Sequence, residues 1–415
     1  MIINSSWIYL FVKALRSHFK TPTIHPGCCK IAHSPVNTAR IEDQLYPLVS
    51  IIIPARNEEN NIERTLSSIL SQNYPNFELI VVDDNSTDNT LRVIQEKINR
   101  RDGSITGLDR LKVISVTEKP KGWTGKTWAS QQGYYESGGD LLLFTDADSY
   151  YFDKNAIGLG VSYMQKESLD VLTGVPFLEL RDFWSRIVIP VWFLFTEVFG
   201  TGMADMNNPK SRVAYLMGSF FIIKRKVFED IGSFQHVRDD IQEDRSLGII
   251  IKQRGYNVKI FKVDKIIAAQ LSRDLSTLWH TLRRTIAPIA TESKLRVSMN
   301  LATIFFMATF PFIIFPYTLV ITLNHNTYVK SPLNQQFLLF SSDNTLLFIN
   351  GTSCFLVIIA TAIKGFKKHS LIPVYSLLAG LGAVFLTITH LYYIIQLLAS
   401  NKPKPIVWRG RFIDL

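Results

Sequence analysis

Two acidic residues stand one residue apart at the end of an apolar run of the chain. Asp146 and Asp148 directly follow Leu141–Phe144, with Thr145 between. Two carboxylates on one turn can face a hard divalent cation, Mg or Mn, and leave positions open for phosphate oxygens. A solvated turn is the alternative, but the place after a buried run favours a metal site. Because His and Cys do not cluster at metal-ligand spacing, zinc is not expected.

A second acidic group, Asp83 and Asp84, ends the apolar run that begins at Phe77. These residues could cap the helix that follows. Capping needs one such side chain, however, and the stretch to Asp88 supplies three carboxylates. An aspartate here can accept a hydrogen bond from the imide N–H of a nucleobase.

Basic residues accompany these carboxylates. Arg56, together with Glu58, follows Pro54 at the end of the first apolar run. Lys126 opens a predicted helix after Gly122–Gly125, whose glycines let the backbone approach a ligand closely. A cation at a helix N-terminus suits a pyrophosphate, although the spacing of a Walker motif is missing.

Glu243 and Asp244 lie between the polar turn Arg238–Gln242 and the helix-like stretch Arg245–Arg254. Acidic residues at a helix N-terminus are favourable in any protein, which is one interpretation. The other is that Asp244 is a general base that removes a hydroxyl proton.

The elements that would position these residues alternate between strands and helices. Buried apolar runs predict four strands, and apolar residues at helical spacing predict three helices between them, one of them capped by Ser86 or Thr87. The predicted strands are Leu48–Pro54, Phe77–Asp83, Leu111–Val116 and Leu141–Thr145, and the predicted helices are Glu59–Gln72, Asp88–Asn99 and Lys126–Ser137. This order predicts an α/β fold with a mostly parallel sheet and helices on both faces. Such sheets bind ligands beyond the carboxyl ends of their strands, where the polar residues lie.

Taken together, these motifs resemble the family 2 glycosyltransferases, which have the GT-A fold. The resemblance covers about Leu48–Pro288. Its markers are Ser50–Glu58 (SIIIPARNE), Leu79–Thr87 (LIVVDDNST), Thr145–Asp148 (TDAD) and Gln242–Asp244 (QED). Within the family, Gly122–Ala129 (GWTGKTWA) and Trp408–Arg411 (WRGR) resemble membrane enzymes that glycosylate carotenoid acids or act near hopanoid pathways.

The resemblance implies a role for each matching residue. The nucleoside would be held by Pro54, Arg56, Glu58, Asp83 and Asp84, and the diphosphate by Lys126. Asp146 and Asp148 would bind Mn or Mg together with the donor diphosphate. Asp244 would be the catalytic base, supported by Glu243, in a single displacement that inverts the anomeric centre.

The sequence lacks one motif that is found in the processive members of this family. Processive polysaccharide synthases carry Gln-x-x-Arg-Trp after the base, whereas the comparable stretch here, His280–Arg284, lacks both the Gln and the Trp. This difference, with few apolar runs, argues against a synthase that extrudes a polymer.

Apolar runs late in the chain predict a membrane region of about three helices. The candidate spans are Met299–Leu323, Thr345–Ile363 and Leu371–Ala399, the last able to bend at Gly380 and Gly382. Buried core helices are the alternative. The earlier run Trp7–Val12 is too short for a full span and is expected to be an interfacial anchor or half a span, not a signal peptide. Phe183–Gly200 is expected either to lie in the membrane interface or to be a core helix.

Charge sets the expected topology. The loop Lys364–His369 holds three lysines, which places it and the large N-terminal domain in the cytoplasm of a multi-pass protein of the cell membrane. Three full spans would leave the basic tail Asn401–Leu415 outside, so either the charge rule fails there or one run is re-entrant.

The expected organisation is a flexible lead-in over 1–45, a GT-A catalytic domain over 46–298 with an interfacial segment at 183–200, a membrane region over 299–399 and a basic tail over 400–415. The formal net charge of +10 suits an anionic membrane surface, and its scattered distribution argues against nucleic acid. The expected partners are a nucleotide-sugar donor, with UDP favoured, and a membrane lipid acceptor. The alternatives are a polyprenyl-phosphate glycosyltransferase and a catalytically inactive nucleotide-binding scaffold.

Overall fold

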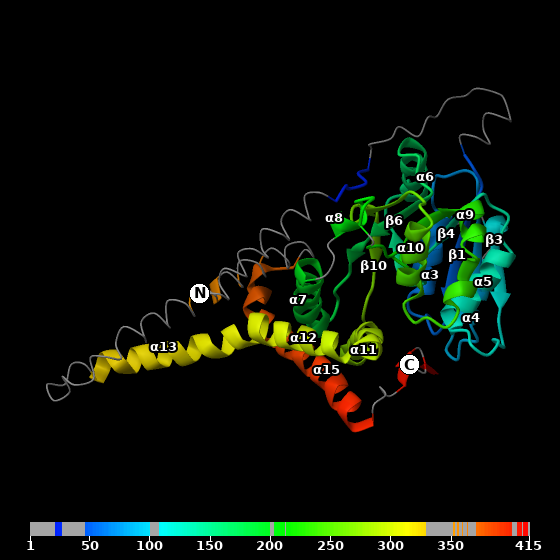
Figure 1. Cartoon of the computed structure of the whole chain (residues 1–415). Coiled ribbons are helices and arrows are strands. Elements are labelled where there is room, and N and C mark those ends of the chain that lie inside the picture. Colours follow the sequence, from blue (N-terminus) through cyan, green and yellow to red (C-terminus); the bar gives the residue numbers. More distant parts are fainter. Residues whose placement is uncertain are drawn as a thin grey trace.

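A computed structural model describes residues 21–26, 46–99, 108–199, 203–211, 213–328, 371–400, 405–408 and 410–413, with single residues between 352 and 363. An α/β body is joined to a group of long helices, and the described C-terminal strands return to the body (Figure 1). The predicted run Trp7–Val12 and loop Lys364–His369 lie outside the described residues, as does nearly all of Thr345–Ile363.

The centre of the body is a seven-stranded sheet in the order β3-β2-β1-β4-β8-β6-β9. Its strands are β1 (Val49–Ala55), β2 (Phe77–Asp83), β3 (Leu111–Ser115), β4 (Leu141–Phe144), β6 (Val171–Val175), β8 (Phe221–Lys224) and β9 (Val258–Lys262). Every neighbouring pair is parallel except the two pairs that β8 makes. The prediction of a mostly parallel α/β sheet is therefore confirmed. A smaller sheet joins β5 (Ser149–Tyr151), β10 (Ile267–Ala269) and β7 (Phe177–Leu178).

Helices cover both faces of this sheet. One face packs on α3 (Ile62–Leu70), α4 (Thr90–Asn99) and α6 (Ala156–Lys166), and the other on α5 (Gly125–Tyr135), α9 (Arg225–Asp230) and α10 (Glu243–Gln253). The short helix α8 (Met203–Met206) and the 3-10 turns Leu108–Arg110 and Ser233–Val237 complete the body. The predicted cap of α4 is wrong: the Thr90 amide donates to Asp88, while the Thr87 amide donates to Asn57.

Part of the lead-in is held against the sheet. Thr23 forms a parallel bridge with Lys262 at the edge strand β9, and Ile24 is fully buried. The Lys262 amide donates to the Pro22 carbonyl at 2.8 Å. The prediction of a flexible lead-in is therefore wrong for residues 22–24, because main-chain hydrogen bonds fix them.

The remaining helices pack beside the body. They are α7 (Phe183–Phe199), α11 (Leu275–Glu292), α12 (Lys294–Ile304), a π-helical stretch (Phe305–Thr309), α13 (Phe310–Tyr328), a 3-10 turn (Pro373–Leu378) and α15 (Ala379–Ser400). Apolar residues of α7, α11, α12 and α15 form one shared core. Ile187 and Val188 of α7 are fully buried in it, so α7 has the packing expected of a core helix.

The glycines of α15 serve close packing. A Cβ at Gly382 would lie 2.2 Å from the Ile187 carbonyl oxygen, and one at Gly380 would lie 2.5 Å from the Phe312 ring. Small residues let helices approach closely in this way. In the described part of the chain, one helix, Val374–Ser400, is long and apolar enough to cross a membrane.

Residues after α15 form a two-stranded hairpin, β11 (Ile406–Trp408) and β12 (Arg411–Ile413). Gly410 has a φ of 78°, which glycine adopts freely at a tight turn. The hairpin lies below the carboxyl ends of the central strands and contacts α11 (Figure 1). Residues 405–408 and 410–413 of the expected basic tail thus lie against the body, where Arg411 contacts Asp84.

Candidate active site

The acidic turn after β4 is held from three sides. The Thr145 hydroxyl donates to the Ser219 carbonyl at 2.8 Å, and the Thr65 hydroxyl donates to the Ala147 carbonyl at 2.8 Å. The Gln270 amide donates to the Asp148 carbonyl. The Thr145 hydroxyl and the carbonyls of Ala147 and Asp148 therefore hold the backbone of the turn.

Lys126 connects this turn to the predicted catalytic pair. Its Nζ lies 2.9 Å from Asp146 Oδ1 and 2.8 Å from Glu243 Oε1. Burial lowers the pKa of Lys126, but the charges of Asp146, Glu243 and Asp244 outweigh it and raise that pKa above its ordinary value. The lysine therefore stays charged at the meeting point of β4, α5 and α10.

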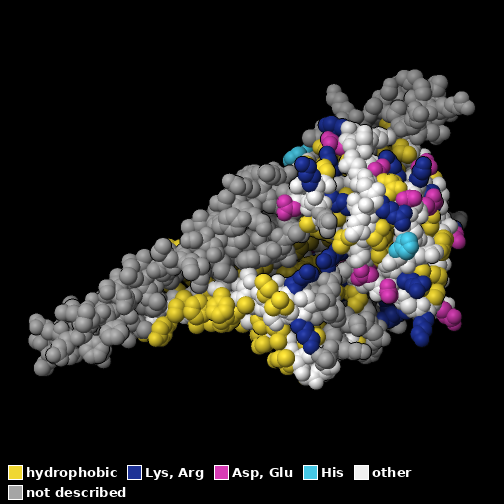
Figure 2. Space-filling view, viewed as in Figure 1, with side chains coloured by type: hydrophobic (Ala, Val, Ile, Leu, Met, Phe, Trp, Pro, Cys, Tyr) yellow, Lys and Arg dark blue, Asp and Glu magenta, His cyan; other side chains and the backbone are white. Residues whose placement is uncertain are grey.

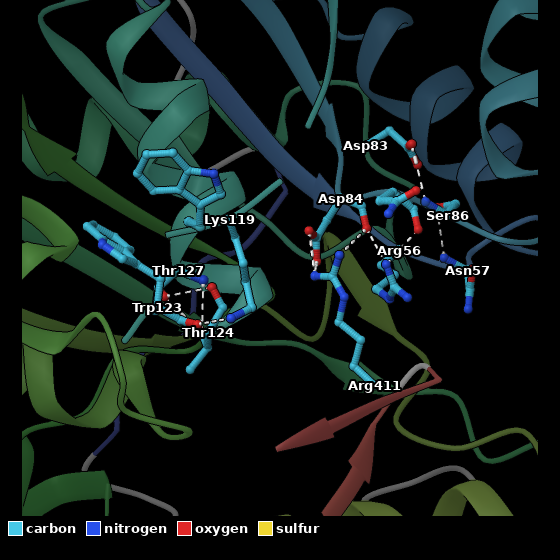
Figure 3. Close-up of polar contacts among 12 residues, drawn as sticks. Arg56, Asn57, Asp83, Asp84, Ser86, Lys119, Trp123, Thr124, Thr127 and Arg411 are labelled. Carbon is cyan, nitrogen blue, oxygen red and sulfur yellow. Dashed lines mark hydrogen bonds and ion pairs between the residues drawn. The ribbon is translucent and has the colours of Figure 1, made fainter. Parts of the chain in front are cut away.

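Local hydrogen bonds hold the first turn of helix α5, which carries this lysine. Thr124 is the N-cap, and its hydroxyl accepts from the Thr127 amide at 3.2 Å. The Thr127 hydroxyl in turn donates to the Arg238 carbonyl at 2.7 Å. Lys119 donates to the Trp123 carbonyl (Figure 3). These contacts fix the first turn of the helix, which carries Lys126.

The surroundings of Asp244 raise the pKa of its carboxyl group. Burial and the neighbouring Glu243 raise its pKa to about 6, against the opposing effect of Lys126 and Arg284. The Arg245 amide donates to Asp244 Oδ1 at 2.8 Å, and the Asp244 side chain is half-buried. A carboxyl with this pKa is mostly ionised at neutral pH and can still accept a proton.

Asp83 and Asp84 lie at the carboxyl end of β2, both 4% exposed. Asp83 Oδ2 accepts from the Ser86 amide at 3.3 Å, while its buried Oδ1 has no hydrogen-bond partner in the part of the chain that the structure describes. Arg411 Nη1 lies 2.7 Å from Asp84 Oδ1 and 2.5 Å from Asp84 Oδ2 (Figure 3). Burial raises the pKa of Asp84, and Arg411 opposes the rise.

The end of β1 and the loop that follows carry the remaining residues predicted to bind the nucleoside. Arg56 Nη1 donates to the Asp84 carbonyl at 2.5 Å and to the Asn85 carbonyl at 2.6 Å. Pro54 stands in register with Val82 of β2. Glu58 is 6% exposed and forms an ion pair with Arg273 at 2.5 Å, so its carboxylate already binds a protein group.

The site residues therefore form two groups. Asp146, Lys126, Glu243 and Asp244 form one, and Arg56, Asp83 and Asp84 form the other, with Glu58 tied to Arg273 beside it. Sequence reasoning did not assign roles to Arg273, Arg284 and Arg411. The only signals for them were the basic pair at 283–284 and the Trp408–Arg411 motif.

Asp146 and Asp148 are the residues that could hold a cation. In the described ranges there is no group of three or more His, Cys, Asp or Glu side chains that could bind a metal ion. Two carboxylates supply the hard oxygen ligands that Mg and Mn prefer. They fit a metal that takes its remaining ligands from phosphate oxygens and water.

Comparison with known proteins gives concordant results. Residues 50–232 match the family model described as glycosyl transferase family 2. The chain is 29% identical over 221 residues to a probable glycosyltransferase of Bacillus subtilis, covering 52% of this chain and 49% of that protein. It is 37% identical over 231 residues to the 4,4'-diaponeurosporenoate glycosyltransferase of Staphylococcus aureus, covering 55% and 58%. The chain thus spans about half the length of the curated relatives it matches.

The fold also matches a solved structure. A mannosyltransferase from Pyrobaculum calidifontis, in complex with GDP-Man and Mn2+, aligns with a TM-score of 0.50 at 17% identity, covering 97% of this chain and 100% of that one. The mixed sheet with its mostly parallel strands is that of the GT-A fold.

Proposed function

We propose, from the family 2 glycosyltransferase domain that residues 50–232 form, that this protein transfers a sugar from a nucleotide-sugar donor to a membrane lipid. The observation that carries the proposal is the position of Lys126 between Asp146 and Glu243, at 2.9 and 2.8 Å. One cation thereby joins the predicted donor side of the site to the predicted base. A scaffold that only binds nucleotide would not need this connection.

On the donor side, the nucleoside is held by Pro54, Arg56, Glu58, Asp83 and Asp84. Among these, Asp83 offers a buried acceptor oxygen, suited to an N–H or O–H of the nucleoside. Lys126 contacts the diphosphate, and Asp146 with Asp148 holds Mg or Mn. When bound, the cation stabilises negative charge on the departing nucleotide.

On the acceptor side, Asp244 removes the proton of the lipid hydroxyl as its oxygen attacks the anomeric carbon. The bond to the diphosphate oxygen breaks in the same displacement, which inverts the anomeric centre. Lys126 places positive charge beside the departing diphosphate. Glu243, only 8% exposed, anchors that lysine and supports Asp244 electrostatically.

An exposed apolar surface beside the site supports a lipid acceptor and membrane attachment. Arg284 of α11 acts electrostatically on Asp244, and α11 packs against α12 and α15. Large apolar side chains on these helices point away from the protein (Figure 2). On α15 and the turn before it they recur every three or four residues, at Leu377, Leu381, Val384, Ile388, Leu391, Ile395 and Leu398. On α12 to α13 they are Leu295, Met299, Phe306, Ile313, Tyr317 and Val320.

The C-terminal hairpin restricts the membrane topology. Its Arg411 binds Asp84, so the chain before α12 and the chain after α15 lie on one side of any membrane. We therefore propose an even number of crossings between Ser293 and Pro405, with one apolar run re-entrant or interfacial, instead of three full spans. Where the last apolar run is the one that does not cross, the lysine-rich loop 364–369 lies on the same side as the catalytic domain, and its charge supports a cytoplasmic location for both.

Lipid mass spectrometry tests this function. Cells that contain the protein should accumulate a lipid heavier by one sugar residue than in cells without it, and the Asp244→Asn variant should not restore that lipid. A product that releases its sugar in mild acid would identify a polyprenyl phosphate acceptor, since glycosyl phosphates are acid-labile. Identical lipid profiles, together with no release of nucleoside diphosphate by purified protein given membrane lipids, would contradict the proposal.

A further inference from the structure

The C-terminal hairpin brings Arg411 to the carboxyl end of β2, beside the predicted nucleoside group. Arg411 Nη1 donates to both carboxylate oxygens of Asp84, and its Nη2 lies 3.4 Å from the Asp84 carbonyl. In Figure 3 the arginine extends from β12 toward Asp84, with Arg56 beside it. The two partners of this ion pair are 327 residues apart in the chain.

The positive charge of Arg411 stabilises the ionised form of Asp84, which matters because Asp84 is buried. The Asp84 side chain is 5% exposed and adjoins Asp83, which is also buried. Arg56 gives its Nη1 to main-chain carbonyls, whereas Arg411 binds the Asp84 carboxylate directly. A buried carboxylate without a bonded cation would favour its neutral form.

The start of α5 is shaped around this ion pair. A Cβ at Gly125 would lie 2.2 Å from Asp84 Oδ2 and 2.6 Å from Arg411 Nη1, so a larger residue does not fit there. The hairpin turn also lies next to the loop after β1, because a Cβ at Gly410 would lie 3.5 Å from Asn57 Nδ2. Three separate segments thus meet Arg411 at the strand ends.

We propose that Arg411 is a positioning residue of the donor site, which holds the Asp84 carboxylate ionised and oriented to accept a hydrogen bond from the nucleotide base. The donor site is then complete only when the C-terminal hairpin is docked. This inference rests on the proposed function, because it assigns Arg411 to the binding of that donor.

The chemistry of the base explains why the charge matters. An ionised carboxylate accepts hydrogen bonds only, and each of its oxygens has lone pairs left after Arg411 is bound. A protonated carboxyl presents an O–H donor toward the base N–H and loses an acceptor. The charged groups that face Asp84 are Asp83 of β2, Arg56 after β1 and Arg411 of β12. Burial and Asp83 raise the pKa of Asp84, whereas Arg56 and Arg411 lower it. Without Arg411, Arg56 is the one of these charged groups that still lowers it.

The test is nucleotide binding by the full-length protein in detergent, measured by calorimetry with UDP and with GDP, each with MnCl2, at pH 6 and pH 8. Arg411→Met should weaken binding of the preferred nucleotide by about ten- to a hundredfold, the range for a lost hydrogen bond to a charged group. The loss should be larger at pH 6 than at pH 8, because removal of Arg411 raises the pKa of Asp84 further. Arg411→Lys keeps the charge and should recover part of the affinity.

The matched control is Arg254→Met, which removes an arginine–aspartate pair, to Asp230, on the exposed surface outside the site. It should bind nucleotide as the wild type does. If Arg411→Met does not fold, Arg411→Gln is compared with Arg411→Lys at the two pH values. Wild-type affinity in the Met or Gln variant at both pH values, or tighter binding, overturns the role of Arg411. A wild-type protein that binds neither UDP nor GDP contradicts the proposed function itself, and the inference falls with it.

Discussion

Replacing Lys126 by methionine tests how the two halves of the site are coupled. The substitution keeps the length of the aliphatic side chain and removes the ammonium group from Asp146 and Glu243. Lys126 is one of two cations that lower the pKa of Asp244. Its loss leaves Asp146, Glu243 and Asp244 with less positive charge nearby, so the pKa of Asp244 should rise.

The size of the effect follows from the charges. With a pKa of about 6, about nine-tenths of Asp244 is ionised at pH 7. A nearby opposite charge typically lowers the pKa of a carboxyl by about one to three units. A rise of about two units would leave about one-tenth of Asp244 ionised at pH 7, so loss of the base alone lowers the rate about tenfold.

The assay is the single-turnover rate at saturating donor, measured from pH 5 to pH 9. In the wild type the rate should fall as the pH drops through about 6, because the base becomes protonated. In Lys126→Met this fall should begin at a higher pH, whatever the absolute rate. Lys224→Met, which breaks the exposed pair with Asp170, is the matched control and should leave the profile unchanged. An unshifted acidic limb in Lys126→Met would refute the coupling.

Three further predictions concern the base, the metal and the topology. Asp244→Asn should lower the single-turnover rate by about 10²–10⁴, with little change in donor Kd. The same variant should raise Tm at pH 7. The pKa of Asp244 is higher in the folded than in the unfolded protein, so its ionised form destabilises the fold at pH values above about 6, and this cost is absent at pH values below the ordinary pKa of aspartate. A rate near that of the wild type would make Glu243 the next candidate. Asp148→Asn should weaken Mn-dependent donor binding and the rate together, and full activity in excess EDTA would contradict a metal site. In a cysteine-free protein, Ser400→Cys and Glu96→Cys should react with an impermeant thiol reagent from the same side of the membrane, and labelling from opposite sides would contradict an even number of crossings.

The early part of the fold could be predicted from sequence because its signals are local. Strand β2 has the predicted bounds, and β1 differs from the prediction by one residue at each end. Continuous apolar runs that end in polar turns determine both the strands and the edge of the sheet where the site lies. The carboxylates of Asp146 and Asp84 follow directly from that pattern.

The second half of the sheet was harder to predict. Strands β6 and β8 are short, and β8 runs antiparallel between two parallel neighbours. A short apolar run has no direction of its own, since direction depends on the connection that precedes it. The ion pairs of Glu58 with Arg273 and of Asp84 with Arg411 were not predicted for a related reason. Their partners are 215 and 327 residues apart, and no local periodicity records such a contact.

The long separation of Asp84 from Arg411 also orders events during biosynthesis. Asp84 leaves the ribosome 327 residues before Arg411, an interval of about 15–65 s at usual rates of translation. The helices α11 to α15 are made in that interval, before Arg411. If Arg411 completes the donor site and these helices attach the protein to a membrane, as proposed, a nascent chain lacks one cation of that site until its apolar helices have been made. Binding of the nucleotide sugar would then follow membrane attachment.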